Sequence, residues 1–264
     1  DPSVRLPVMV NLDGFYLSFT REPVSLPEQD AVSPFLPPFD PGAIRFAASA
    51  PESQAVAVLG GSPYSYFRYE THLAAQNALA VHASIAEDFR NLFGRDRAAL
   101  EAYRLDDAEI AFYMMGSFAT KAREAVDRLR EAGQRVGLLR PRLLRPFPTD
   151  SIAKALQGVA GVAVIDQNLS MGKGGVLHTE LAAELYGRKD SPRVLTSFIG
   201  GLGGREIAPE EFYQIAEVTR RAVKTGQTPP PRLLYTEDEL REIRKLQSVA
   251  MVERNETTPG GNTP

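Results

Sequence analysis

The stretch VAVIDQNLSMGKGGV, residues 162–176, decides the fold. Its first five residues form an apolar run that ends at Asp166, and the glycine-rich segment 170–175 follows directly. A short apolar run that ends in glycines and precedes an amphipathic segment is typical of a buried strand, a loop and a helix. Similar apolar runs occupy residues 108–115, 135–139 and 194–199.

Segments with helical spacing lie between and after these runs. We expect helices over residues 118–132 and 151–157, after residue 175, and from Pro209 to about Lys224. Strands that are apolar throughout and alternate with helices indicate an α/β fold, a parallel sheet with helices on both faces. Ligands and partners approach the carboxyl edge of such sheets, and the glycines of this chain cluster at that edge.

Composition excludes several classes of function. The 264 residues are 43% hydrophobic and 24% charged, with a net charge of −3, which argues against a nucleic-acid-binding protein. No apolar stretch approaches the roughly 20 residues that a membrane helix needs. There is no cysteine, so a thiolate nucleophile and a cysteine-held iron–sulfur cluster are excluded in this chain. The three histidines, His72, His82 and His178, lack metal-site spacing.

The flanking segments complete the predicted organisation. Residues 6–12 read as a buried strand, 66–93 as a long helix, and Thr236 to Glu239 as a capping box that opens a charged helix to about Val252. Residues 255–264 are expected to be disordered. We therefore divide the chain into five parts. Residues 1–24 are a first segment, residues 25–65 a proline-rich linker, and residues 66–107 a long helix with a connection. Residues 108–226 form an α/β domain, and residues 227–264 are a linker, a charged helix and a tail.

Two glycine-rich loops, residues 170–175 and 200–205, are the candidate binding site. Glycines and a lysine between a strand and a helix can hold a phosphate through backbone N–H groups, although neither loop is a Walker A or GxGxxG motif. The alternative is that the glycines allow a neighbouring domain to approach closely. The candidate partner or coenzyme contacts are Gly172, Lys173, Gly174, Gly175, Gly203, Gly204 and Arg205.

The remaining polar groups favour ordinary structural roles. Asp166, at a strand end, is interpreted as a cap of the following turn rather than as a catalytic acid. Asp106, Asp107 and Glu109 are interpreted as the start of a helix or strand rather than as a metal site. A local group of arginines is expected to form ion pairs, with an anionic partner or coenzyme as the alternative; it comprises Arg135, Arg140, Arg142 and Arg145.

Six short motifs occur in a fixed order along the chain. They are Leu12 to Phe15 with Ser18, Gly94-Arg95 through Glu101 to Arg104, Asp107 to Glu109, Met115 to Ser117, Val136 to Arg140 through Arg145 to Pro148, and Gly201 to Arg205. Taken in order, they resemble the α subunit of pyruvate:ferredoxin oxidoreductase and its 2-oxoacid relatives. The resemblance extends from residue 6 to about residue 223.

This resemblance implies a fold, an activity and partners. It implies an α/β domain similar to the transketolase carboxyl-terminal domain, preceded by the last strand of a thiamine-diphosphate-binding domain whose body would lie before Asp1. It also implies a cytoplasmic complex with beta, gamma and ferredoxin-like subunits that uses thiamine diphosphate, Mg²⁺ and iron–sulfur clusters. Such a complex converts pyruvate and coenzyme A to acetyl-CoA, CO2 and reduced external ferredoxin, or the reverse, without nucleic acid or membrane.

The catalytic residues of the family do not map onto this sequence. The substrate-contacting threonine and arginine and the thiamine-activating glutamate are expected before Asp1, so no catalytic residue and no cofactor is assigned to this chain. Relatives often have other residues at Gln167, Glu206 and Lys173, which leaves open another 2-oxoacid such as 2-oxoglutarate. The competing hypotheses are a stand-alone nucleotide- or coenzyme A-binding module and a non-catalytic assembly protein. We expect a structural and interface segment.

Overall fold

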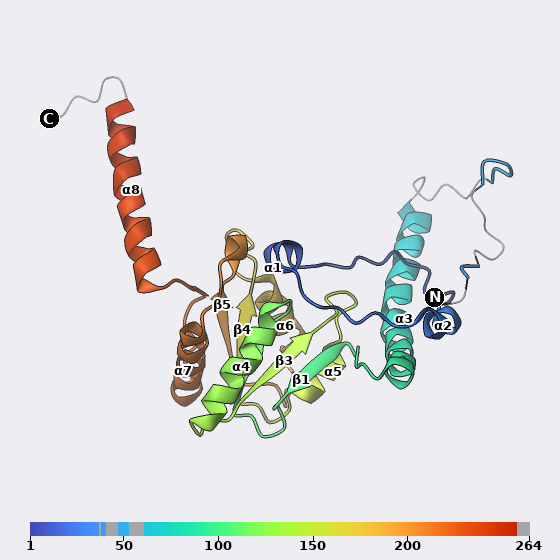
Figure 1. The fold of residues 1–264 in the computed structure, drawn as a ribbon, viewed down its shortest axis with the longest axis horizontal. Coiled ribbons are helices and arrows are strands. Elements are labelled where there is room, and N and C mark those ends of the chain that lie inside the picture. The colour runs from blue at the N-terminus through green and yellow to red at the C-terminus, as the bar shows by residue number, and fades with distance from the viewer. Residues whose placement is uncertain (37, 41–46, 53–60, 258–264) are drawn as a thin grey trace.

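A six-stranded sheet forms the centre of the computed structural model, which describes residues 1–36, 38–40, 47–52 and 61–257 (Figure 1). The strands lie in the order β1-β3-β2-β4-β5-β6, and all neighbours are parallel except β1 and β3. Their bounds are β1 Leu100–Tyr103, β2 Ile110–Tyr113, β3 Val136–Pro141, β4 Gly161–Asp166, β5 Val194–Ile199 and β6 Arg232–Leu233. The predicted α/β class is therefore confirmed, with a sheet that is mostly parallel rather than parallel throughout.

Helices cover both faces of the sheet, as the continuous apolar strands require. α4 (Phe118–Glu131) and α7 (Pro209–Thr225) pack on one face and enclose a core around Phe112, Phe198 and Phe212. α5 (Thr149–Ala155) and α6 (Val176–Leu185) pack on the other face. Close packing of α7 explains one glycine, because a Cβ on Gly161 would lie 2.5 Å from Val223 Cγ2.

In the part of the chain that the structure describes, four helices lie outside this domain. α1 (Gly14–Phe19) sits over the carboxyl edge of the sheet, and α2 (Gln29–Phe35) packs through Phe35 against the end of α3 (Gly61–Phe93) (Figure 1). α3 lies beside the domain and buries only Ala86. α8 (Glu237–Thr257) projects away from the sheet, and its described side chains include exposed Leu246 and Met251.

Residues 6–12 do not form the predicted strand. Val8, Met9 and Val10 are more than four-fifths exposed and have no β partner. A strand is stable only when a neighbour accepts and donates its backbone hydrogen bonds. The apolar pattern of this segment is typical of a strand, but no strand forms because no described part of the chain pairs with it.

The sequence interpretation also missed several short elements. β1 lies within the segment predicted as helix and connection, and it makes the sheet mixed rather than purely parallel. Its sequence LEAY is short and partly exposed, so it carries little strand signal. The expected proline-rich linker contains α2 and the start of α3, while other parts of it lie outside the described residues. α8 continues to Thr257, so residues 255–257 are helical rather than disordered, and 258–264 lie outside the described residues.

Candidate functional site

The strand order places a topological switch point between β2 and β4 at the carboxyl edge of the sheet, and we call this point the crevice. The chain leaves β2 toward β3 on one side and later crosses to β4 on the other side. The loops after β2 and β4 therefore diverge, and the gap between them is the usual ligand site of such sheets. Gly116 and Ser117 follow β2 and Gln167 follows β4, so these residues line the crevice.

The carboxylate of Asp13 occupies this crevice. The backbone N–H of Ser117, at the start of α4, donates a hydrogen bond to Asp13 Oδ2. Gly116 has φ +80°, and a Cβ there would lie 2.6 Å from Gln167 Oε1 and 2.8 Å from Asp13 Oδ2. A carboxylate at a helix N-terminus is favourable because it accepts a free N–H and faces the positive end of the helix dipole. The chain thus fills its own ligand crevice with an anion.

Aromatic residues of α1 hold this arrangement in place. The ring of Phe15 lies against the backbone of Gly204, where a Cβ would overlap it. Tyr16 packs edge-to-face on Phe118 with ring centroids 4.8 Å apart. Lys121 lies 5.0 Å from the centre of the Tyr16 ring and pairs with Glu206. The second glycine-rich loop therefore receives α1 of the same chain, which agrees with the alternative that its glycines allow close approach.

Arg205 is engaged with carboxylates on two helices. Its guanidinium donates to both oxygens of Glu211 at 3.0 and 3.1 Å and to both oxygens of Glu239 at 2.5 and 2.6 Å. These hydrogen bonds raise the pKa of Arg205 and lower the pKa of Glu239 to about 2. Gly203, with φ +66°, has open space where a Cβ would stand. Arg205 ties the loop to α7 and to the start of α8.

The first glycine-rich loop forms a tight turn at the rim. The backbone N–H of Gly174 donates to the Ser170 carbonyl at 3.0 Å, and Ser170 N–H donates back to Gly174. Gly172 and Lys173 are exposed, and open space surrounds the Cβ position of Gly172. Arg205 of the other loop is instead paired with Glu211 and Glu239.

Asp166 has the structural role that the sequence indicates. Its carboxylate is buried and accepts hydrogen bonds from the backbone N–H groups of Leu177 at 2.7 Å and His178 at 3.2 Å, at the start of α6. Gly175 is required beside it, because a Cβ there would overlap the Asp166 carboxylate. Burial raises the pKa of Asp166, although these two backbone bonds oppose the shift.

Tyr113 adds a polar group that the sequence did not reveal. Its side chain is fully buried at the end of β2, and its hydroxyl has no hydrogen-bond partner among the described residues. Burial and the negative charge of Asp166 both raise the pKa of Tyr113. His178 is half-buried nearby, and its pKa is lowered mainly by burial. Among the described residues, no printed hydrogen bond joins the side chains of Tyr113, Asp166 and His178 to one another.

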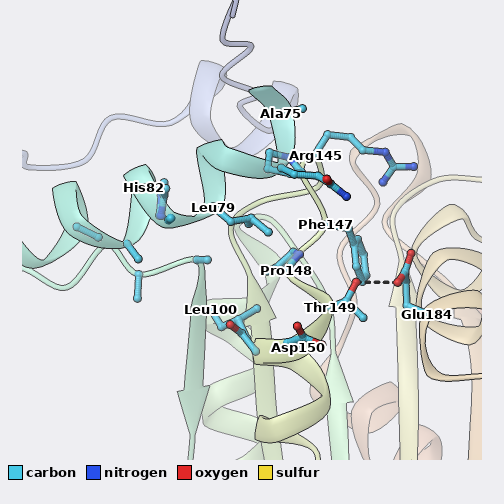
Figure 2. A pocket seen from close by; sticks show the side chains of 18 of the residues that line it. Ala75, Leu79, His82, Leu100, Arg145, Phe147, Pro148, Thr149, Asp150 and Glu184 are labelled. Carbon is cyan, nitrogen blue, oxygen red and sulfur yellow. Dashed lines mark hydrogen bonds between the residues drawn. The ribbon is translucent and has the colours of Figure 1, made fainter. Parts of the chain in front are cut away.

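A cleft of about 1150 Å³ separates α3 from the α/β domain (Figure 2). Leu79 and a series of alanines line it from α3, and Phe147 and Pro148 line it from the opposite wall. Figure 2 shows His82 on the α3 side; its Nδ1 is buried without a partner in the described structure, and burial and Arg142 lower its pKa. His72 and His82 both line the cleft, and among the described residues they belong to no group of three or more side chains placed to hold a metal ion.

The arginines and acidic residues singled out in the sequence form ion pairs. Arg145 contacts Glu180 at 2.5 Å, Arg135 lies 4.0 Å from Glu109, and Asp107 accepts from Arg130 at 2.6 Å. Asp106 has no described role in the site. Arg140 and Arg142 both face Glu101, which sequence reasoning had not placed near them. Ion pairing is therefore the main role of this group, as the sequence favours.

Within the described residues, no helix is long and apolar enough to cross a membrane. No group of three or more histidine, aspartate or glutamate side chains in that part of the chain is placed to hold a metal ion. The site is thus an α/β carboxyl edge filled by a helix of the same chain, with a separate cleft beside α3.

The comparisons with known proteins agree with the motifs. Residues 108–212 match the family described as Pyruvate:ferredoxin oxidoreductase core domain II. Pyruvate synthase subunit PorA of Methanothermobacter thermautotrophicus is 39% identical over 219 residues, which cover 83% of this chain and 55% of the relative. Ketoisovalerate oxidoreductase subunit VorA of Pyrococcus horikoshii is 35% identical over 227 residues, covering 85% and 57%. A solved 2-oxoglutarate:ferredoxin oxidoreductase from Magnetococcus marinus aligns with 74% of this chain and 30% of its own, with 19% identity and a TM-score of 0.39.

Residues 108–212 are therefore a pyruvate:ferredoxin oxidoreductase core domain II, and the predicted resemblance to 2-oxoacid:ferredoxin oxidoreductase α subunits is confirmed. The chain spans a little over half the length of these curated relatives, at 55% and 57%.

Proposed function

We propose that this chain is part of the α subunit of a complex that oxidatively decarboxylates pyruvate with coenzyme A. The reaction gives acetyl-CoA and CO2, and the electrons from the broken carbon–carbon bond reduce ferredoxin; the complex can also run in reverse. The observation that carries this proposal is the 39% identity to a pyruvate synthase PorA subunit over 219 residues. Within the complex, this chain acts as a structural and interface segment.

The filled crevice supports this structural role. In an α/β enzyme the carboxyl edge usually holds the ligand, but here Asp13 and α1 occupy it. We propose that residues 1–24 belong to the end of a thiamine-diphosphate-binding domain, and the exposed apolar side chains of Val8 to Val10 support an interface role for this segment. The divisions at residues 25–65, 66–107, 108–226 and 227–264 remain part of the same proposal.

The cofactors of the proposed reaction do not fit the residues of this chain. Iron–sulfur clusters are held by cysteine thiolates, and the sequence has no cysteine. The described residues also offer no cluster of metal-ligating side chains for the Mg²⁺ that accompanies thiamine diphosphate. We therefore assign these cofactors to other parts of a cytoplasmic complex, with beta, gamma and ferredoxin-like subunits or domains as partners and external ferredoxin as electron acceptor.

Reconstitution tests this division of labour. The complex would be assembled with and without this chain, and pyruvate-dependent reduction of viologen would be followed with thiamine diphosphate, Mg²⁺ and coenzyme A. We expect turnover only from the complete assembly and none from this chain by itself. Turnover by the isolated chain, or an assembly that works equally well without it, would refute the proposal.

A branched 2-oxoacid is the second candidate substrate. The 35% identity to a ketoisovalerate oxidoreductase VorA subunit is close to the identity with PorA. Comparing turnover with pyruvate, 2-oxoisovalerate and 2-oxoglutarate in the reconstituted complex separates these substrates. We expect pyruvate to give the largest kcat/KM, and preference for another acid would move the assignment within the family.

A further inference from the structure

Three arginines from different elements converge on a single carboxylate beside the carboxyl edge of the sheet. Glu101 on β1 lies opposite Arg140 on β3, and Arg142 follows the end of β3. Arg142 Nη2 is 2.5 Å and Arg140 Nη1 is 3.5 Å from Glu101 Oε2, while Arg123 of α4 contacts Glu101 Oε1. We call Arg123, Arg140 and Arg142 the arginine cluster.

Positive charge exceeds negative charge around the arginine cluster. The Glu101 side chain is 12% exposed and provides one negative charge to three guanidinium groups. Asp13 attracts Arg140 and Asp96 attracts Arg142, but Arg97 adds a fourth positive charge. Asp13 and Asp96 also accept hydrogen bonds from the backbone N–H groups of Ser117 and Ala98, and with Glu101 they give three negative charges against four positive ones. An excess positive charge in a partly buried site favours binding of an anion.

Arg140 also has hydrogen-bonding capacity to spare. Guanidinium carries five N–H donors, and within the described structure the one ion pair of Arg140 is the 3.5 Å contact to Glu101. The Glu101 oxygens already accept shorter bonds from Arg123 and Arg142. The Arg140 side chain is 27% exposed, so it is reachable from solvent. Burial and the neighbouring Arg123 and Arg97 lower its pKa, a penalty that a bound anion would relieve.

The arginine cluster is held in position before any ligand arrives. The Arg123 guanidinium lies 5.0 Å from the centre of the Tyr103 ring, and the Tyr103 hydroxyl donates to Asp127 at 2.8 Å. Arg142 Nη1 donates to the Ala98 carbonyl at 3.1 Å. Side chains that are already ordered lose little conformational entropy on binding, and planar guanidinium groups match tetrahedral oxyanions through paired hydrogen bonds.

We propose that the arginine cluster is an oxyanion site that binds a phosphate group, with Arg140 as its main free donor and Glu101 as the residue that positions the arginines. The same chemistry is offered by free inorganic phosphate and by the phosphate groups of a larger molecule such as coenzyme A. The site does not depend on the proposed reaction, because no electron-transfer or carbon chemistry is assigned to it.

Calorimetric titration of the full chain tests the proposal. Inorganic phosphate, coenzyme A and dephospho-coenzyme A are the three probes, and the last one lacks the 3′-phosphate. We expect saturable phosphate binding that weakens about tenfold in Arg140→Ala, since one charge-assisted hydrogen-bonding group is lost. Tighter binding of coenzyme A than of both other probes identifies the 3′-phosphate as the source, and equal affinities identify free phosphate.

Two further variants separate binding from folding. Arg140→Lys keeps the charge but loses the planar fork, so we expect an intermediate loss of affinity and an unchanged melting temperature. Arg188→Ala removes an exposed arginine that pairs with Asp150 away from the cluster, and it should leave affinity unchanged. Absence of saturable phosphate binding, or equal affinity in wild type, Arg140→Ala and Arg140→Lys, would overturn the proposal and leave the cluster as a structural ion-pair network.

Discussion

The two glycine-rich loops look alike in sequence but differ in what they contact. Gly204 of the second loop lies against the Phe15 ring, and Arg205 is bound by two carboxylates. Gly172 and Lys173 of the first loop are exposed at the rim. Both loops have glycines at positive φ, so backbone conformation alone does not distinguish them. Glycine richness marks a place where backbone conformation is special, and only the fold tells whether another segment lies against it.

The largest expected effect separates these two loops directly. Gly204→Ala places a methyl group at φ +81° and against Phe15, whereas Gly172→Ala meets only the unfavourable φ of +78°. We expect Gly204→Ala to cost roughly 2–4 kcal/mol and Gly172→Ala about 1 kcal/mol of unfolding free energy. Urea denaturation gives both values, and faster amide exchange of residues 13–20 in Gly204→Ala alone would report release of α1. Equal costs for the two variants would contradict the comparison.

The cap at the base of the first loop should give the next effect. Asp166→Ala leaves the N–H groups of Leu177 and His178 without their acceptor, and we expect a loss of about 1–2 kcal/mol. Asp166→Asn keeps an acceptor oxygen and removes the buried charge, so it should be the milder variant. Thermal unfolding of the two proteins compares them, and a neutral Asp166→Ala would show that the cap is dispensable.

The same residue gives the first loop an unusual pH dependence. Because the folded-state pKa of Asp166 is raised above its unfolded value, the folded state holds its proton more tightly. The contribution of Asp166 to stability is therefore fully present below the unfolded pKa, and it is lost as pH rises through the folded pKa. Urea unfolding of wild type and Asp166→Asn between pH 3 and 7 measures this contribution. A difference that grows in favour of wild type with rising pH would contradict it.

The second loop should respond to pH in the opposite direction, with a smaller effect. Arg205 lowers the pKa of Glu239 to about 2, so their contact stabilises the start of α8 above the unfolded pKa of a glutamate. That stabilisation is lost as pH falls toward 2. Because Glu239 is partly exposed, we expect Glu239→Gln to change overall stability by less than about 1 kcal/mol. Amide exchange over residues 236–242 at pH 6 and pH 3 detects the local change.

The smallest structural effect is expected at Lys173. Its side chain is exposed, and Lys173→Ala should leave the melting temperature unchanged. The hypothesis of a stand-alone coenzyme A-binding module predicts instead that this variant weakens coenzyme A binding. Parallel titration of Lys173→Ala and Arg140→Ala distinguishes the first loop from the arginine cluster as the phosphate site.

The strands β2 to β5 could be predicted from the sequence because each of these segments carries its own hydrophobic pattern. The runs at β2 to β5 are mostly apolar and almost entirely buried, so burial on both faces leaves no alternation and the continuous apolar run is itself the signal. β1 was missed because its four residues are half-exposed and its partner lies 41 residues further on, as the pairing of Leu100 with Pro141 shows. Long-range pairing of a short edge strand leaves no local pattern.

The candidate site was only partly accessible to sequence reasoning. The cap by Asp166 follows from its place between a strand and a helix, which is local information. The contact of Asp13 with Ser117 joins residues 104 positions apart, and no periodicity in the sequence predicts it. The Asp-Gly-Phe motif is identified in the sequence only by its resemblance to a family. The structure shows what its residues do: the Asp13 carboxylate lies in the crevice, and the Phe15 ring packs on Gly204.

The position of Asp13 in the crevice has a consequence for how such a protein can be divided into separate genes. A break between α1 and β2 would place the Asp13 carboxylate and the Ser117 N–H that binds it on different polypeptides. The upstream product would then have to deliver Asp13, Phe15 and Tyr16 in trans, and assembly of the two products would depend on their concentrations. When α1 and the α/β domain belong to one chain, the Asp13 carboxylate is held near the start of α4 at a high effective concentration.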